Sequence, residues 1–327
     1  MSTTVQEKSK LFVPAQSPPK TSVNRWRAFY ELARVHKPAG VLAFHIPLLL
    51  GSLVSVDTEV PRPEFLDGAI FFVQLFLSSF VLRSAACVWN DAADYKFDSQ
   101  VARTRTRPIP SGAATPAAAR VFAVALIFLW VGIVWQASGD QAFYTLIPNF
   151  LFNVAYPFAK RVTDYPQLFL GLMFSWNVLT GYMMTTRYDM IEALQMPQIQ
   201  QSLGYLAVAN VAWTVLYDTI YAYQDIADDE KAGVRSLALK WKSYGKLALS
   251  ILAGIEVGSL VAAGIAIDAG PWYFSFSCLG SAMVAAVGLI TLDLTNPENC
   301  GLWFKRHLLY GGITMCTGFV VEYVQKL

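Results

Sequence analysis

Long apolar runs that carry almost no charge alternate with short charged segments along most of the chain. A helix needs roughly 20 mostly apolar residues to cross a bilayer, and nine runs reach or approach that length. They lie at residues 38–56, 68–90, 121–139, 141–159, 165–186, 202–224, 247–267, 269–292 and 307–321. The pattern therefore predicts an all-α membrane protein, a polytopic bundle of nine transmembrane helices.

The composition supports this interpretation. Apolar residues make up 55% of the 327 residues and charged residues only 15%, whereas a soluble domain usually carries about a quarter charged residues. The mean hydropathy is +0.41. These values exclude an ordinary soluble enzyme and a disordered chain. The net charge of +2 gives no reason to expect nucleic acid as a partner, and nothing indicates an obligate protein partner. The four cysteines show neither disulfide nor zinc spacing.

The basic residues predict the orientation. With nine spans, 21 of the 25 Lys and Arg residues fall in the N-terminal segment and the even-numbered loops, so this side is expected to face the cytoplasm. Residues 1–24 are polar and contain three prolines, which predicts a disordered cytosolic tail before a single transmembrane domain at 25–327. This tail does not resemble a mitochondrial presequence. We therefore expect an endomembrane location, such as the endoplasmic reticulum, rather than the mitochondrial inner membrane.

Acidic residues gather at the ends of the second and sixth predicted spans. Asp91, Asp94 and Asp98 are spaced to share one face of a helix. The second cluster has a similar periodicity and consists of Asp218, Asp225, Asp228 and Asp229. Acidic residues at the apolar boundary of a membrane are costly and mark functional sites. The alternative, that both clusters are only helix ends exposed to water, therefore explains the pattern less well. Clusters with oxygen ligands alone suit Mg²⁺, which usually takes one or two carboxylates together with substrate phosphates.

Basic residues accompany both acidic clusters. They are Arg103 and Arg107 after the first cluster, Lys231 and Arg235 after the second, and Lys160 and Arg161 between the two. If these basic residues served only to orient the protein in the membrane, this would explain on which side they lie. It would not explain why several Arg residues are concentrated in one Pro-rich loop. The planar fork of Arg matches phosphate oxygens. Acids that hold magnesium and cations that hold diphosphate together predict a pocket for an organic diphosphate whose tail lies in the membrane.

Four segments resemble the UbiA superfamily of intramembrane prenyltransferases. LRSAACVWNDAADYKFDSQVARTRTRPIPSG resembles the first aspartate-rich motif of the family, and LYDTIYAYQDIADDEKAGVRSLAL resembles the second. YPFAKRVTDYPQLFLG is similar to the start of the family's fifth helix, and NPENCGLWFKRH to the stretch before its last helix. The four similarities follow the family's order between residues 83 and 307. Ala86 and His307 depart from the Gly and Asn that are usual at these positions.

The resemblance implies a bundle around a central cavity that opens to the lipid, and Mg²⁺-dependent transfer of a prenyl group from a prenyl diphosphate to an aromatic acid. It implies a metal site at Asn90, Asp94, Asp98, Asp225 and Asp229. It implies that four basic residues bind the diphosphate or the aromatic acid: Arg103, Arg107, Lys160 and Arg161. Tyr156 and Asp218 are implied as further polar residues of the cavity. Asp218 or Asp225 is expected to act as the base, and aromatic rings, Tyr156 among them, are candidates to stabilise an allylic cation.

The identity of the acceptor is the least defined part of the prediction. The Y-D-T-x-Y-A form of the second motif is similar to that of 4-hydroxybenzoate polyprenyltransferases and of fungal meroterpenoid enzymes. We expect farnesyl diphosphate and an orsellinic-acid-like acceptor in secondary metabolism, with ubiquinone biosynthesis as the first alternative. A terpene cyclase of the same fold is the second alternative. A membrane transporter is the third, although it would predict helices broken in mid-membrane.

Overall fold

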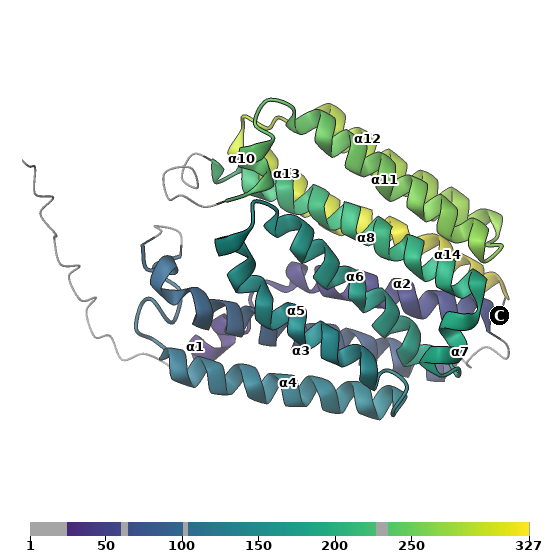
Figure 1. Ribbon diagram of the computed structural model, residues 1–327, viewed down its shortest axis with the longest axis horizontal. Helices are drawn as coiled ribbons and strands as arrows, with labels where there is room; N and C mark the ends of the chain where they lie inside the picture. Colours follow the sequence, from purple (N-terminus) through teal and green to yellow (C-terminus); the bar gives the residue numbers. More distant parts are fainter. Residues whose placement is uncertain (1–24, 60–64, 101–103, 227–234, 327) are drawn as a thin grey trace, which may run out of the picture.

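The computed structural model describes residues 25–59, 65–100, 104–226 and 235–326. Within these residues it contains helices and no strand, and the long helices lie side by side along one direction (Figure 1). The all-α prediction is therefore confirmed. In chain order the helices are α1 (Arg25–Leu32), η1 (Pro38–Val41), α2 (Leu42–Thr58), α3 (Phe65–Asp98), α4 (Pro116–Ser138), α5 (Phe143–Val162), α6 (Pro166–Thr185), α7 (Met190–Gln195), α8 (Pro197–Tyr223), α10 (Leu237–Lys240), α11 (Gly245–Ala266), η2 (Tyr273–Cys278), α12 (Leu279–Thr291), α13 (Pro297–Arg306), η3 (His307–Gly311) and α14 (Gly312–Lys326).

Seven segments within the described ranges are long and apolar enough to cross a membrane. They correspond to all the predicted runs except 141–159 and 307–321. The first of these coincides with α5, whose hydropathy is lowered by Asn149, Asn153 and a basic end. The second coincides with η3 and with α14, which has only 15 residues. The count of nine spans and the central cavity stay predictions.

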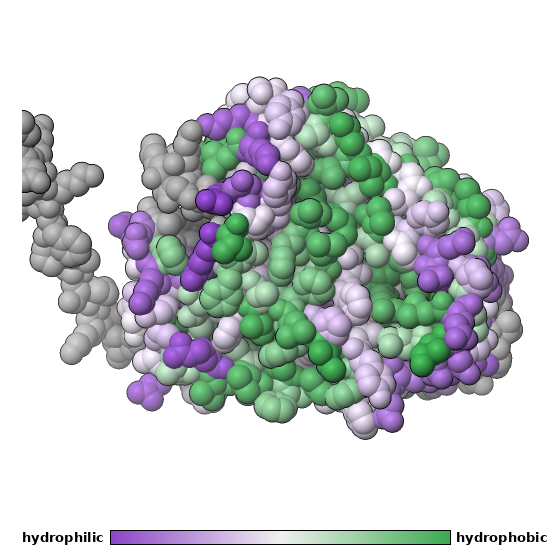
Figure 2. Space-filling view, in the orientation of Figure 1, coloured by the Kyte–Doolittle hydropathy of each residue, from purple (hydrophilic) through white to green (hydrophobic). Residues whose placement is uncertain are grey.

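The surface of the molecule is that of an integral membrane protein. Apolar residues cover the middle of the face shown in Figure 2, and hydrophilic residues gather toward its two ends. Large apolar side chains stand exposed on several helices, for example Phe128 on α4 at 73% and Ile290 on α12 at 79%. A monomeric soluble protein rarely exposes apolar patches of this extent, whereas lipid tails solvate them without cost.

Helices α2 and α6 cross with their backbones in contact at two glycines. A Cβ atom added at Gly51 would lie 1.8 Å from the carbonyl oxygen of Val178, and one added at Gly181 would lie 1.8 Å from that of Leu48. The hydroxyl of Ser52 donates a hydrogen bond of 2.9 Å to the carbonyl oxygen of Gly181. Small residues allow this close approach, which is a common way for membrane helices to pack without a hydrophobic driving force.

Helix α3 is longer than the apolar run that predicted it. The run ends at residue 90, but the helix continues to Asp98 and has 34 residues, so that it is about 51 Å long. The hydrocarbon core of a bilayer is only about 30 Å thick. The last turns of α3, which carry the first acidic cluster, therefore extend beyond the apolar layer to the polar boundary.

Candidate functional site

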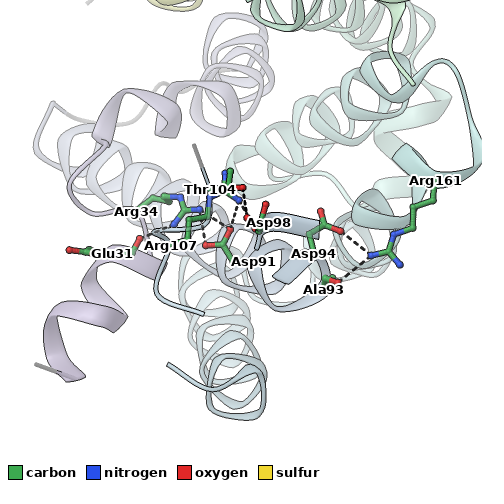
Figure 3. Close-up of polar contacts among 9 residues, drawn as sticks. All are labelled: Glu31, Arg34, Asp91, Ala93, Asp94, Asp98, Thr104, Arg107 and Arg161. Atoms are coloured by element: carbon green, nitrogen blue, oxygen red, sulfur yellow. Dashed lines mark hydrogen bonds and ion pairs between the residues drawn. The ribbon is translucent and has the colours of Figure 1, made fainter. Parts of the chain in front are cut away.

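Two arginines neutralise Asp91 on the last turns of α3. Arg34, which follows α1, places Nη2 2.7 Å from the Asp91 carboxylate, and Arg107 places Nη1 at 3.1 Å. The same nitrogen of Arg107 lies 2.8 Å from Asp98 (Figure 3). The side chain of Asp91 is only 1% exposed. Asp91 therefore anchors the segment after α1 and the loop after α3 to the end of α3.

Asp94 points to a different partner. Its Oδ1 accepts a hydrogen bond of 2.9 Å from Arg161 Nη2, which also donates to the carbonyl oxygen of Ala93 at 3.2 Å (Figure 3). The three acids nevertheless share one face of α3, as their spacing predicts, because α3 stays helical through Asp98. At about 100° per residue, Asp98 lies only about 20° from Asp91 around the helix, whereas Asp94 lies about 60° from it. Asp91 and Asp98 thus share Arg107, and Asp94 faces α5.

The position of Arg34 is set by α3. Arg83 is 6% exposed and donates hydrogen bonds to the carbonyl oxygens of Arg34 at 3.1 Å and of Lys37 at 2.8 Å. The backbone of Arg34 has a φ of 56°, in the left-handed region. A Cβ atom at Gly40 would lie 2.7 Å from Arg83 Nη2, so a residue without a side chain leaves room for the guanidinium. The sequence analysis did not identify Arg34 or Arg83 as site residues. The signal was present, since Arg83 is the one charge in the run 68–90.

Tyr156 of α5 lies between the two acidic clusters. It interacts electrostatically with Asp94 of the first cluster and with Asp218 of the second, and its ring stacks with that of Phe169 on α6. Asp218 lies on α8, and Asp225 follows the end of that helix. The structure thus brings residues from α3, α5 and α8 to one region. Arg103, Asp228, Asp229 and Lys231, and the side chain of Lys160, lie outside the described part of the chain.

The segment that follows the second motif packs on the start of α6. Arg235 Nε lies 3.6 Å from Asp164 Oδ1, in the turn between α5 and α6. The backbone nitrogen of Leu237 donates a hydrogen bond of 3.2 Å to Gln167. Lys240 donates a hydrogen bond to the hydroxyl of Tyr165, and this bond raises the pKa of the Lys240 ammonium. Arg235 and the Arg161 end of α5 therefore lie on neighbouring segments.

The residues of the first motif fit a magnesium ion. Asn90 Oδ1 is buried and has no hydrogen-bond partner, and Asp94 and Asp98 follow it at intervals of about one turn along α3. An oxygen donor set of this kind suits Mg²⁺. Among the described residues, no group of three or more His, Cys, Asp and Glu side chains is gathered as a complete metal site, and Asp229, the fifth predicted ligand, lies outside them.

The sequence matches one known protein family over most of its length. The pattern of the UbiA prenyltransferase family matches residues 44–310, which is most of the chain. The chain belongs to the UbiA prenyltransferase family. The resemblance of the four sequence segments to this family is therefore confirmed.

Relatives of this UbiA protein are named as prenyltransferases. The chain is 34% identical over 304 residues to the UbiA prenyltransferase claS of Ampulloclitocybe clavipes, which covers 93% of each chain. It is also 34% identical over 294 residues to the mitochondrial 4-hydroxybenzoate polyprenyltransferase of Dictyostelium discoideum, which covers 86% of this chain and 60% of the relative. The chain is accordingly an aromatic prenyltransferase.

Solved structures support the fold. A UbiA homolog from Aeropyrum pernix K1 superposes with a TM-score of 0.70 at 20% identity, over 86% of this chain and 97% of that one. A UbiA homolog from Archaeoglobus fulgidus, described as bound to GPP and Mg²⁺, superposes with a TM-score of 0.62 at 13% identity, over 88% of this chain and 99% of that one. At these identities the comparison supports the arrangement of the helices.

Proposed function

We propose that this UbiA protein catalyses the Mg²⁺-dependent transfer of a farnesyl group from farnesyl diphosphate to an orsellinic-acid-like phenolic acid in the biosynthesis of a meroterpenoid. One observation carries the proposal of a diphosphate site. Asp94 and Asp98 are each paired with an arginine, Arg161 at 2.9 Å and Arg107 at 2.8 Å. Acids suited to a metal and cations suited to phosphate therefore occupy one region. The Archaeoglobus fulgidus homolog described as bound to GPP and Mg²⁺ supports the same chemistry.

The proposed metal ligands are residues with oxygen donors from both motifs: Asn90, Asp94, Asp98, Asp225 and Asp229. When bound, Mg²⁺ would neutralise the diphosphate and stabilise the charge that develops on its leaving oxygen. The proposed diphosphate contacts are basic residues next to these acids: Arg103, Arg107, Lys231 and Arg235. Their guanidinium and ammonium groups would orient the diphosphate so that its first carbon points toward the acceptor.

The acceptor side of the site requires an anion partner and a base. We assign the carboxylate of the aromatic acid to Arg161, with Lys160 beside it in the sequence, because the planar guanidinium of Arg161 matches a carboxylate. Asp218 or Asp225 would accept the proton that the aromatic ring loses when the new carbon–carbon bond forms. Asp218 interacts electrostatically with Tyr156, as does Asp94. These interactions support a role for Tyr156 as a substrate contact between the two motifs.

Transfer of a polyprenyl group to 4-hydroxybenzoate is the second candidate function. The observation that favours it is the 34% identity to the Dictyostelium discoideum enzyme named for this reaction. Both acceptors are phenolic acids, so both would use the same carboxylate contact and the same base. They differ in ring substituents and in the length of the prenyl chain. The terpene cyclase and transporter alternatives are not favoured, since the relatives named above are prenyltransferases.

A matrix of substrates separates the two candidates. The purified protein in lipid nanodiscs is given geranyl, farnesyl or a longer polyprenyl diphosphate, each with orsellinic acid or 4-hydroxybenzoate, and the products are identified by mass spectrometry. The proposal expects the highest kcat/KM for the farnesyl and orsellinic acid pair. Preference for 4-hydroxybenzoate with a long polyprenyl chain would replace it with the second candidate. Release of diphosphate without any acceptor would indicate a cyclase.

We also propose a cytoplasmic orientation for the N-terminus and for the loops that carry the acidic motifs, in an endomembrane such as the endoplasmic reticulum. The distribution of Lys and Arg supports the orientation. Single cysteines placed in residues 99–112 and in residues 230–242 should both react with an impermeant reagent added from the cytoplasmic side. Labelling of the two loops from opposite sides would mean that the motifs cannot share a substrate.

A further inference from the structure

A pocket lies between the ends of α3, α4 and α5. Its cavity volume is about 370 Å³. Three basic residues line it, Lys96 of α3, Arg120 of α4 and Arg161 of α5, together with the aromatic side chains of Trp89, Phe97 and Phe158. Its size is within the range of about 300–1,000 Å³ that is usual for ligand sites. The proposed functions of the acidic motifs do not account for Lys96 and Arg120.

Two of the three cations of the pocket, Lys96 and Arg120, are not neutralised by any acid of the described residues. Within the described ranges, no acidic residue is among its lining residues. Arg161 is paired with Asp94 and lies over the rings of Phe97 and Phe158, at 4.9 and 5.1 Å from their centres. Lys96 and Arg120 are exposed, and neither is an ion-pair partner of any acid in those ranges. Two like charges at the mouth of one pocket favour an anionic ligand.

The pocket lies at the ends of membrane helices, next to their apolar surface. Lys96 lies in the last turn of α3, Arg120 near the first turn of α4, and Arg161 in the last turn of α5. The three cations therefore stand at one end of three neighbouring helices. On α4, the residues that follow Arg120 expose apolar side chains, with Val121 at 71%, Val124 at 52% and Phe128 at 73%. An anion held here has an apolar surface directly beside it.

We propose that this pocket binds an anionic phospholipid, with the lipid phosphate between Lys96 and Arg120 and the acyl chains along the exposed apolar face of α4. Basic pockets between membrane helices at the polar boundary are suited to anionic headgroups, and a lipid supplies both the charge and the apolar body that the surface offers. The pocket shares Arg161 with the proposed acceptor site, but the lipid phosphate would contact Lys96 and Arg120, to which the proposed function gives no role. Lipid binding can be measured without turnover.

Binding of lipid to the purified full-length protein in a neutral detergent tests the proposal. Native mass spectrometry measures the apparent Kd for phosphatidic acid and for phosphatidylcholine. Phosphatidic acid should bind at least ten-fold more tightly. Lys96→Ala and Arg120→Ala should each weaken its binding roughly five-fold and should leave phosphatidylcholine unaffected, and Lys96→Arg should retain most of the affinity. Because Lys96 and Arg120 are exposed, all variants should unfold at the wild-type temperature.

Lys305 of α13 provides a matched control, because it is an exposed cation outside the pocket. Lys305→Ala should bind phosphatidic acid as the wild type does. An equal loss in Lys305→Ala would mean that general attraction to anionic lipid explains the binding, and would overturn the proposal. Unchanged binding in the Lys96 and Arg120 double variant would also overturn it. Displacement of the lipid by millimolar inorganic phosphate would show that the pocket recognises a free anion, and displacement by magnesium pyrophosphate would assign the pocket to the substrate.

Discussion

Arg161 of α5 donates a hydrogen bond of 2.9 Å to Asp94 of α3, across 67 residues of sequence. Arg107 lies 2.8 Å from Asp98 in the same way. In each pair the aspartate is a proposed metal ligand. The arginine is a proposed contact for a substrate anion, the acceptor carboxylate for Arg161 and the diphosphate for Arg107. The two kinds of group therefore neutralise each other in the structure. Binding of metal and diphosphate requires that these ion pairs be exchanged for contacts with the ligands.

The exchange predicts that Mg²⁺ and inorganic pyrophosphate bind cooperatively. Either ligand alone would separate the Arg107–Asp98 pair and leave one partner without its counter-charge, whereas both together give Asp98 the metal and Arg107 the pyrophosphate as new partners. Couplings between linked ligands are usually about five-fold or more in affinity. Isothermal titration calorimetry should show at least this tightening of Mg²⁺ binding when pyrophosphate is present, after correction for the complex the two form in solution. Independent binding of the two ligands would contradict the exchange.

Substitution of Arg161 tests the acceptor assignment. Arg161→Ala should raise KM for the aromatic acid roughly ten-fold or more, because a charged hydrogen bond to the carboxylate is lost, and should change KM for the prenyl diphosphate less. Arg161→Lys should restore only part of the affinity, since an ammonium cannot form the fork. Steady-state kinetics with each substrate varied in turn measures both constants. Equal effects on both substrates would reassign Arg161 to the diphosphate, and no effect on either would leave it as a membrane anchor.

The anchor role of Asp91 predicts a loss of stability. Asp91→Asn leaves Arg34 and Arg107 facing a neutral group in a nearly buried site, which should cost about 3 kcal/mol in the free energy of unfolding. Glu31→Gln is the matched control, because Glu31 also pairs with an arginine, Arg27 at 2.9 Å, but at the surface. Its cost should stay below about 1 kcal/mol. Denaturation in mixed micelles gives both values. Equal costs for the two variants would show that Asp91 does not anchor the segments around it.

The crossing of α2 and α6 predicts a second, independent effect on stability. Gly181→Ala places a methyl group 1.8 Å from the carbonyl oxygen of Leu48, so the helices must separate, at a cost of about 1–3 kcal/mol or more. Gly254 of α11 has nothing within 4 Å of an added Cβ. Gly254→Ala should therefore be neutral, or more stable by up to about 1 kcal/mol. The unfolding temperatures of both variants, compared with that of the wild type, test this prediction. An unchanged unfolding temperature for Gly181→Ala would contradict the close crossing.

The fold class was predictable because length and the absence of charge suffice to mark a membrane helix. The limits of that signal are visible in α5. Asn149 donates a hydrogen bond of 2.5 Å to Asn177, and Asn153 donates to Asn149, so these buried amides join α5 to α6 within the protein. Their partners are 28 or 4 residues distant, and the sequence alone does not show that such polar residues are satisfied inside a helix bundle.

The residue types of the site were predictable, but their pairing was not. Motif spacing singled out Asp94, Asp98 and the basic residues near them. Arg34 was counted only as a topogenic charge, because its contact with Asp91 joins residues 57 positions apart and depends on the turn that Arg83 holds. Similarly, His307 was noted only as a departure from the family. The structure places its Nε2 3.6 Å from Glu256 of α11, and both side chains are buried. Tertiary contacts of this kind leave no local pattern in the sequence.

The most direct test of the central claim is diphosphate release by the purified protein, followed with and without Mg²⁺, with farnesyl diphosphate and orsellinic acid as substrates. The account predicts release only when both Mg²⁺ and the aromatic acid are present, with one prenylated product formed per diphosphate. It also predicts that Asp94→Asn abolishes both diphosphate release and formation of the prenylated product. Asp67→Asn of α3 is a control that should retain activity. Undiminished turnover in the presence of EDTA, or release that does not depend on the aromatic acid, would contradict it.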